Sequence, residues 1–400
     1  MSKLFQPIEV GGKRLSHRVV LAPLSRRRAN VAHVHGDLAV EYYSQRGSTP
    51  GTLLISESTE VAAKASGSAN VPGIWSEEQV KAWRRVTDAV HAKGSFIVCQ
   101  LRAQGRVSDP SVLAAEDPNF PYVSASDVKL TQRPFPPRPL SISEIQEYIQ
   151  LFTTAATNAM KAGFDGVEVH AANGYLIDQF LQDVTNRRKD EYGGSIENRC
   201  RFGLEVVDAV VKVVGAQKTG IRLSPWETFN VLDSLEMRME DPKPTFSHLV
   251  TKIRDLHPGF GYIHVVEPQV SGIFDREAKP GESNDFLREI WGTRPFISAG
   301  GYSRDLAMDI ADKTGNLIAF GRFFISNPDL PTRLEKGLEL APYDRKTFYT
   351  QTAEGYVDYP FAEASASVEV ADDKSVQLNT FSTTLSSAIR VVWNKVGGSA

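Results

Sequence analysis

The sequence has little cysteine and little net charge. Cys99 and Cys200 are the only cysteines in 400 residues, and both lie in apolar or helical contexts. Two such cysteines do not make a disulfide framework, so we expect a reducing compartment. The formal net charge of -3 gives no field that would attract nucleic acid or an anionic membrane, and the basic run at residues 26–28 is too short to change this. We therefore expect a small-molecule partner and no nucleic-acid partner.

Long apolar runs are also missing. No window of about eighteen apolar residues exists, which excludes a membrane-spanning helix. Residues 1–7 lack the charged start and apolar centre of a signal peptide. We expect a cytoplasmic protein without a membrane partner, present as a monomer or a homodimer.

The chain does contain eight short apolar runs, separated by stretches with the period of a helix. The runs cover residues 19–25, 52–58, 95–101, 166–170, 219–225, 261–267, 294–300 and 317–322. Strands separated by helices must be parallel, and right-handed crossovers leave a closed barrel or an open doubly wound sheet. Eight similar units favour closure, so the sequence predicts an α/β fold, a (β/α)8 TIM barrel, over residues 1–365.

Other segments carry their own signals. A Gly-Gly pair at residues 11–12 predicts a hairpin, which we expect to plug the bottom of the barrel. Ser143 is a candidate cap for the helical stretch that follows it, although the spacing of Ser141 and Glu144 resembles a capping box. Residues 366–400 form a C-terminal extension, which we expect to be docked on the chain's own surface or partly disordered.

Two connections are longer than a barrel requires, residues 102–140 and 184–198. Both lie on the C-terminal rim, where long loops usually build substrate pockets. The first is rich in proline at residues 134–139, so we expect it to be extended rather than helical.

The fourth apolar run ends in a cluster of polar residues. The run ends at His170, and Asn173 and Tyr175 follow at three and five residues. A barrel strand delivers polar groups to its C-terminal rim in this way. An imidazole and a carboxamide can donate two hydrogen bonds to one substrate oxygen, and a phenol beside them can supply a proton. The three residues therefore form a candidate catalytic site suited to polarising a carbonyl group.

The ends of the other runs form a candidate cofactor site. Glycines and an arginine follow the seventh and eighth runs, where backbone amides and a cation would meet a phosphate. They are Gly300, Gly301, Gly321 and Arg322. Gln100 can donate and accept towards the edge of a heterocycle, and Arg222 places a permanent positive charge beside a ring that becomes anionic on reduction. These are the requirements of a phosphate-bearing flavin.

Five segments of the chain resemble the Old Yellow Enzyme family. They are residues 22–25, 71–75, 163–176, 186–199 and 320–322. The resemblance spans residues 3–361 and is greatest to the fungal and plant members that include the ergot-alkaloid and 12-oxophytodienoate reductases. It implies a (β/α)8 barrel that holds FMN noncovalently. It also implies reduction of electron-poor alkenes of α,β-unsaturated carbonyl compounds in fungal secondary metabolism, with NADPH or NADH as reductant.

The resemblance implies a role for each cofactor residue. Pro23, Leu24 and Ser25 would back the flavin, with Ser25 in place of the commoner threonine. Gln100 and Arg222 would bind its pyrimidine part. The phosphate segments would contain Gly301, Gly321 and Arg322.

The same resemblance assigns the substrate side. His170 and Asn173 would hold the carbonyl oxygen of the substrate, and Tyr175 would be the proton donor. Three further residues would line the substrate side, namely Phe229, Asn230 and Tyr349.

One position departs from the family in a way that bears on the substrate. Where the family usually has Gln-Leu-Trp, this chain has Gln-Leu-Arg, which places Arg102 two residues after Gln100. Strand alternation turns both side chains to the same face, so Arg102 would lie near whatever stacks on the flavin. It then contacts an anionic or strongly polar substrate, or it pairs with a carboxylate of the loop that it opens. The candidate carboxylates are Asp109, Glu116 and Asp117.

Three other functions are compatible with parts of the pattern. His33 and His35 could begin the divalent-metal site of a hydrolase, but Arg222 stands where another ligand would be wanted, so we predict no metal site. A redox-neutral isomerase or cyclase could use the same flavin scaffold, although the presence of Tyr175 favours net reduction. A binding protein without turnover is suggested only by Arg102.

Overall fold

The structure is a computed structural model that describes residues 1–226, 238–271 and 274–362. The predicted substrate-side residues Phe229 and Asn230 lie outside the described residues, as does the predicted extension over residues 366–400. No helix within the described ranges is long and apolar enough to cross a membrane.

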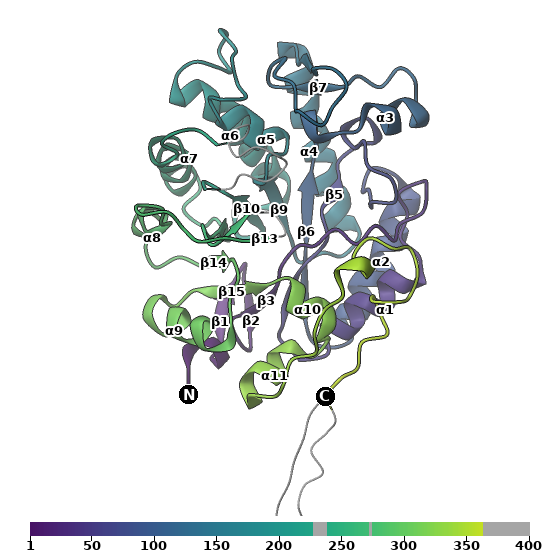
Figure 1. The fold of residues 1–400 in the computed structure, drawn as a ribbon, viewed down its shortest axis with the longest axis vertical. Coiled ribbons are helices and arrows are strands. Elements are labelled where there is room, and N and C mark those ends of the chain that lie inside the picture. Colours follow the sequence, from purple (N-terminus) through teal and green to yellow (C-terminus); the bar gives the residue numbers. More distant parts are fainter. Residues whose placement is uncertain (227–237, 272–273, 363–400) are drawn as a thin grey trace, which may run out of the picture. The chain divides into compact units, whose positions relative to one another are not determined.

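Eight parallel strands form a closed barrel (Figure 1). Each strand pairs with the next along the chain, and the pairing of the last strand with the first closes the ring. The strands are β3 (Val19–Leu21), β4 (Leu53–Ile55), β6 (Phe96–Arg102), β9 (Gly166–Ala171), β10 (Thr219–Leu223), β11 (Tyr262–Val266), β14 (Phe296–Ala299) and β15 (Leu317–Phe320). The predicted TIM barrel and all eight strand positions are confirmed.

The first strand ends earlier than its apolar run predicts. β3 ends at Leu21, whereas the run continues to Ser25. Pro23 has no backbone N–H to donate to a neighbouring strand, so the chain leaves the sheet here. Residues 22–25 are thereby free to line the space above the barrel.

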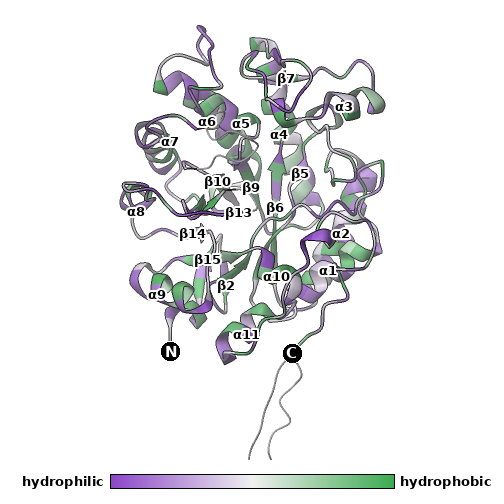
Figure 2. Ribbon diagram, viewed as in Figure 1, coloured by the Kyte–Doolittle hydropathy of each residue, from purple (hydrophilic) through white to green (hydrophobic). Residues whose placement is uncertain are grey.

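Helices surround the barrel in the described part of the chain. Figure 2 shows the strands mostly in the apolar colour, whereas the helices carry both colours, as expected when one side of each helix packs on the barrel. The helices are α1 (Asp37–Arg46), α2 (Glu77–His91), α3 (Pro110–Glu116), α4 (Ile142–Lys161), α5 (Leu176–Leu181), α6 (Ile196–Val214), α7 (Lys243–Leu256), α8 (Asp285–Trp291), α9 (Arg304–Thr314), α10 (Arg322–Ser326) and α11 (Leu330–Lys336).

The cap of α4 differs from the prediction. Ser141, not Ser143, caps the helix: its hydroxyl accepts from the amide of Glu144, and its own amide donates to the Glu144 carboxylate at 2.8 Å. Ser143 lies inside the first turn of the helix. The capping-box spacing of Ser141 and Glu144 therefore predicted the start of the helix better than the start of the helical pattern at Ser143.

The N-terminal hairpin lies where it was expected. It consists of β1 (Ile8–Val10) and β2 (Lys13–Leu15), joined by the two glycines at φ 59° and 74°. Val10 and Leu15 pack in one cluster with inward residues of the barrel such as Leu53 and Leu317. These contacts confirm that the hairpin plugs the barrel.

The long loop after β6 is only partly as predicted. Its proline-rich end begins in bends at residues 134–135 and ends in β8 (Arg138–Pro139), which pairs with β7 (Val123–Ser124). The loop also contains α3, whose first turn is capped by the carboxylate of Asp109, so the loop is not extended throughout. A further two-residue strand, β5 (Thr59–Glu60), runs beside the end of β6.

Candidate active site

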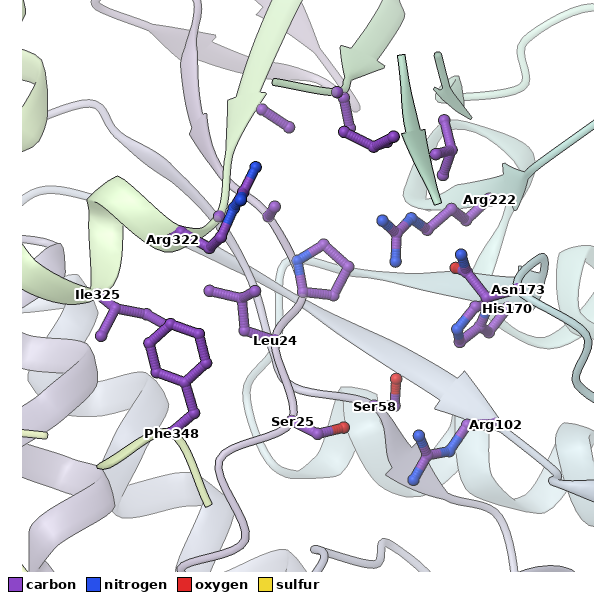
Figure 3. Close-up of a pocket in the computed structure, with 18 of the residues that line it drawn as sticks. Leu24, Ser25, Ser58, Arg102, His170, Asn173, Arg222, Arg322, Ile325 and Phe348 are labelled. Carbon is purple, nitrogen blue, oxygen red and sulfur yellow. The ribbon is translucent and has the colours of Figure 1, made fainter. Parts of the chain in front are cut away.

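A cavity of about 560 Å³ lies over the carboxyl ends of the barrel strands. Figure 3 shows side chains from several strands pointing into it. Thirteen of the predicted site residues line it, namely Pro23, Leu24, Ser25, Arg102, His170, Asn173, Tyr175, Arg222, Gly300, Gly301, Gly321, Arg322 and Tyr349. Among the predicted residues that the structure describes, Gln100 alone does not line the cavity.

His170 is a buried, neutral imidazole on the wall of the cavity. It is 3% exposed, and its Nδ1 has no hydrogen-bond partner among the residues that the structure describes. Burial, followed by the positive charges of Arg222 and Arg102, holds its pKa well below the ordinary value. A neutral imidazole can donate one hydrogen bond to a substrate oxygen, but it is not a strong acid.

Asn173 and Tyr175 lie in the turn that follows β9. Asn173 has φ 57°, a left-handed conformation that asparagine tolerates better than most residues. The backbone N–H of Asn173 donates to Ser224 Oγ at 2.7 Å, and the backbone N–H of Gly174 donates to Asp178 Oδ2 at 2.9 Å. The ring of Tyr175 meets the ring of His170 edge-on, with centroids 4.9 Å apart. The turn therefore brings the three predicted catalytic residues to one wall of the cavity.

Gln100 lies one layer deeper in the barrel than predicted. Its amide oxygen accepts from Ser58 Oγ, and its amide nitrogen donates to Glu168 Oε1 at 2.7 Å. Glu168 also binds His264 Nδ1 at 2.9 Å. Burial opposes ionisation of Glu168, but His264 and Arg222 outweigh it, so the pKa of this carboxyl is lowered. Ser58 lines the cavity above Gln100, although it was not among the predicted site residues. Its position at the end of the apolar run 52–58 could have indicated it.

The segments after β14 and β15 form the other end of the cavity. A Cβ on Gly300 would meet the Cβ of Glu267 at 2.9 Å, and Gly301 has φ 67°, so both positions favour glycine. Arg322 forms a two-point ion pair with Asp275 of β13 (Phe274–Asp275), which pairs with β12 (Val270–Ser271). No sequence signal indicated Asp275, because its partner is distant in the chain.

Arg102 lines the cavity, but its partner is not one of the predicted loop carboxylates. Its Nε donates to Glu60 Oε1 at 2.9 Å, Nη2 also contacts this oxygen, and Gln104 donates to it at 2.8 Å. Glu60 is the register partner of Arg102 between β5 and β6. The predicted pairing with Asp109, Glu116 or Asp117 is therefore wrong, because the adjacent strand supplies a carboxylate first.

His33 and His35 both contact other groups of the protein. His33 Nδ1 lies 2.6 Å from the carbonyl of Val71, and its Nε2 lies 2.7 Å from Glu116 Oε1. His35 is buried, with Glu57 Oε1 at 3.5 Å. In the described part of the chain no group of three or more His, Cys, Asp or Glu residues is placed to hold a metal ion.

The arrangement agrees with comparisons of the whole chain. Residues 3–341 match the model of the NADH:flavin oxidoreductase / NADH oxidase family. The chain belongs to this family. It is therefore an NAD(P)H-dependent flavin oxidoreductase, and FMN is its cofactor.

Individual relatives of this oxidoreductase cover nearly the whole chain. It is 47% identical over 377 residues to the chanoclavine-I aldehyde reductase of Penicillium roqueforti, which covers 93% of this chain and 100% of the relative. It is 44% identical over 375 residues to a probable inactive dehydrogenase of Claviceps fusiformis, covering 90% and 95%. The solved structure of morphinone reductase aligns with a TM-score of 0.82 and 38% identity, covering 90% of this chain and 96% of that one.

The residues of the cavity fit FMN. Its volume lies in the range of small-ligand and cofactor sites. Gly300, Gly301, Gly321 and Arg322 would hold the phosphate, where a side chain at Gly300 would collide with Glu267. The 23–25 segment would back the ring, and Arg222 would stabilise negative charge on it. Figure 3 shows Arg322 and Arg222 on opposite sides of the cavity, which suits a molecule with a phosphate at one end and a ring at the other.

Replacing Arg322 with Ala should weaken FMN binding by roughly 10- to 150-fold, because a charge-assisted contact to phosphate contributes roughly 1.5 to 3 kcal/mol. Asp275→Asn is the matched control. The Asp275 carboxylate, which is 63% exposed, would compete with the phosphate for Arg322, so removing its charge should leave FMN binding equal or tighter. Fluorescence titration of the apoprotein with FMN measures both constants; wild-type affinity in the Arg322 variant would contradict this assignment.

Proposed function

We propose that this flavin oxidoreductase reduces the activated C=C bond of α,β-unsaturated carbonyl compounds in fungal secondary metabolism. The observation that carries the proposal is the wall formed by His170, Asn173 and Tyr175, two hydrogen-bonding side chains beside a phenol. The similarity to a relative named chanoclavine-I aldehyde reductase supports a carbonyl-bearing substrate.

The chain's own residues divide the work between binding and proton supply. When bound and reduced by NADPH or NADH, FMN supplies a hydride to the β-carbon of the alkene. His170 and Asn173 donate hydrogen bonds to the carbonyl oxygen, where negative charge develops as the β-carbon gains the hydride. Because His170 is neutral, its donor role does not depend on protonation in the physiological range.

Tyr175 completes the reduction by giving its phenolic proton to the α-carbon. Its ring makes a T-shaped contact with the His170 imidazole and lies against the Arg102 guanidinium, whose Cζ is 4.7 Å from the ring centroid. These contacts hold the phenol on the cavity wall. One hydride and one proton together convert the C=C bond into a C–C single bond.

Anaerobic stopped-flow absorbance tests the proposal. The flavin of the holoenzyme is bleached with NADPH or NADH and mixed with enones, enals and unsaturated carboxylates. Return of flavin absorbance with a saturated product supports ene reduction. An isomerised product without consumption of reductant would instead assign a redox-neutral reaction, and no reoxidation by any of these compounds would point to a binding protein.

Tyr175→Phe should slow reoxidation of the flavin by cyclohexenone on the order of 10²-fold, because the variant lacks the proton donor. Reduction of the flavin by NAD(P)H should stay nearly unchanged, since that step needs no proton from the phenol. The rate of flavin reduction in the same variant serves as the control for the rate of reoxidation. Equal slowing of both would mean that the ring is structural.

The remaining sequence predictions concern the whole molecule. We propose a cytoplasmic monomer or homodimer that binds neither nucleic acid nor membrane, as its near-neutral charge indicates. Sedimentation of the purified holoenzyme and fractionation of the source cells would test this.

A further inference from the structure

The basic run at residues 26–28 divides into two structural arginines and one that faces the cavity. Arg26 and Arg28 are buried, and both donate to the carbonyl of Phe348, at 3.2 and 2.9 Å. Arg27 has φ 55°, a left-handed conformation, and its exposed side chain lines the cavity. Arg26 and Arg28 therefore link this run to the segment at Phe348, and Arg27 presents its positive charge to the cavity.

Arg27 lies beside an aromatic ring and has no charged partner among the described residues. Its guanidinium carbon lies 5.5 Å from the ring centroid of Tyr349, the residue after the carbonyl that Arg26 and Arg28 bind. Within the described ranges its guanidinium makes no hydrogen bond or ion pair. Because both neighbours are anchored, the Arg27–Tyr349 pair is set before any ligand arrives, which favours binding.

The charge around the cavity is strongly unequal. Among the described residues, its lining includes five arginines and a single carboxylate, Asp275, which is bound to Arg322. Arg102 is neutralised by Glu60, and Arg133 donates to the carbonyls of residues 107 and 108. Arg222 lies on the ring side of the FMN site. In the part of the chain that the structure describes, Arg27 is thus the cavity-lining cation that neither the catalytic wall nor the cofactor site uses.

We propose that Arg27 and Tyr349 form a binding site at the cavity for a phosphate group of the nicotinamide dinucleotide reductant. A guanidinium is suited to phosphate because its planar donors match the phosphate oxygens, and the adjacent ring adds a flat surface for a base or ribose. Tyr349 lines the same cavity as His170, Asn173 and Tyr175. A dinucleotide whose nicotinamide reaches the catalytic wall would pass this pair on its way out. The inference rests on reduction by NAD(P)H and is independent of the alkene substrate.

Equilibrium binding of non-reactive reductant analogues to the oxidised holoenzyme tests the site. Tetrahydro-NADPH and tetrahydro-NADH are titrated while the flavin absorbance is followed. Arg27→Gln should raise the Kd on the order of tenfold, and Arg27→Lys should recover part of the loss. A loss confined to tetrahydro-NADPH places the 2′-phosphate at Arg27, whereas an equal loss for both places the pyrophosphate there.

Two further measurements separate a local site from a general charge effect. Arg14→Gln removes the same charge from the exposed hairpin at the other end of the barrel and should leave both Kd values unchanged. The Kd of the wild type should rise more steeply with salt than that of Arg27→Gln, since one ionic contact is missing in the variant. Unchanged affinity for both analogues in Arg27→Gln would overturn the proposal. Because no alkene is present, that result would leave ene reduction itself standing.

Discussion

Replacing His170 with Ala, or Asn173 with Ala, is expected to slow enone-driven reoxidation of the flavin on the order of 10²- to 10³-fold for each variant. Both side chains line the same wall of a cavity in which His170 is almost fully buried. A donor aimed at developing charge in such a site is worth far more than one in water. The rate constant of reoxidation at saturating cyclohexenone, measured by stopped flow, is the direct test.

The double variant sharpens this prediction. If both donors act on one oxygen, losing the second should cost less than losing the first, so the combined effect should be smaller than the product of the single effects. His248→Ala, on α7 and away from the cavity lining, controls for the loss of an imidazole. FMN content and unfolding midpoints should be those of the wild type. Two active single variants would refute the assignment of the oxygen site.

Replacing Arg102 with Met is expected to lower the free energy of unfolding by about 3 to 5 kcal/mol, the usual cost of leaving one member of a buried ion pair alone. The side chains of Arg102 and Glu60 are 4% and 0% exposed. Burial already raises the pKa of Glu60 despite the opposing charge of Arg102. Urea denaturation of the holoenzyme and the variant gives the difference.

Two further variants test whether the loss of stability in Arg102→Met comes from the unpaired Glu60 carboxylate. Adding Glu60→Gln to the variant should restore much of the stability, because no buried charge is then left unpaired. Glu147→Gln, which breaks the partly exposed pair with Lys64, should cost at most about 1 kcal/mol. A small effect of Arg102→Met with no recovery in the double variant would argue that solvent reaches Glu60.

The stability of the Arg102 variant should also depend on pH. Without the guanidinium, the pKa of Glu60 in the folded state rises further above its unfolded value. A raised pKa means that the protonated form favours folding, so the deficit should be smallest at low pH and grow as pH rises through the folded pKa. The wild type should show the same trend more weakly, because the Arg102 guanidinium limits the rise in the pKa of Glu60.

The ion pair with Glu60 also bears on whether Arg102 selects anionic substrates. The sequence left open whether Arg102 meets an anionic substrate or a carboxylate of the protein, and the pair with Glu60 satisfies it within the protein. Arg102→Trp, which restores the family's usual residue, should therefore destabilise the fold. Any gain in turnover of simple cyclic enones is best sought together with Glu60→Gln.

The sequence alone determined the barrel and the grouping of the three proposed catalytic residues at the end of one strand. Eight apolar runs alternating with helical stretches have few arrangements open to them, because parallel strands need right-handed crossovers and eight units close. His170, Asn173 and Tyr175 lie within six residues at one strand end, so their proximity is a local property of the chain. The resemblance to the Old Yellow Enzyme family, confirmed by the match over residues 3–341, added the cofactor.

Only the tertiary structure decided which charges meet. Glu60 reaches Arg102 because β5 pairs with β6 in one particular register, and Asp275 reaches Arg322 from a hairpin after a different strand. Gln100 points inward as alternation requires, but its depth in the barrel sends it to Glu168 rather than to the cavity. Arg27 is distinguished from Arg26 and Arg28 only by a left-handed turn and by carbonyls more than 300 residues away. Side-chain pairing across a closed barrel depends on register and layer, and neither is written in the spacing of residues along one strand.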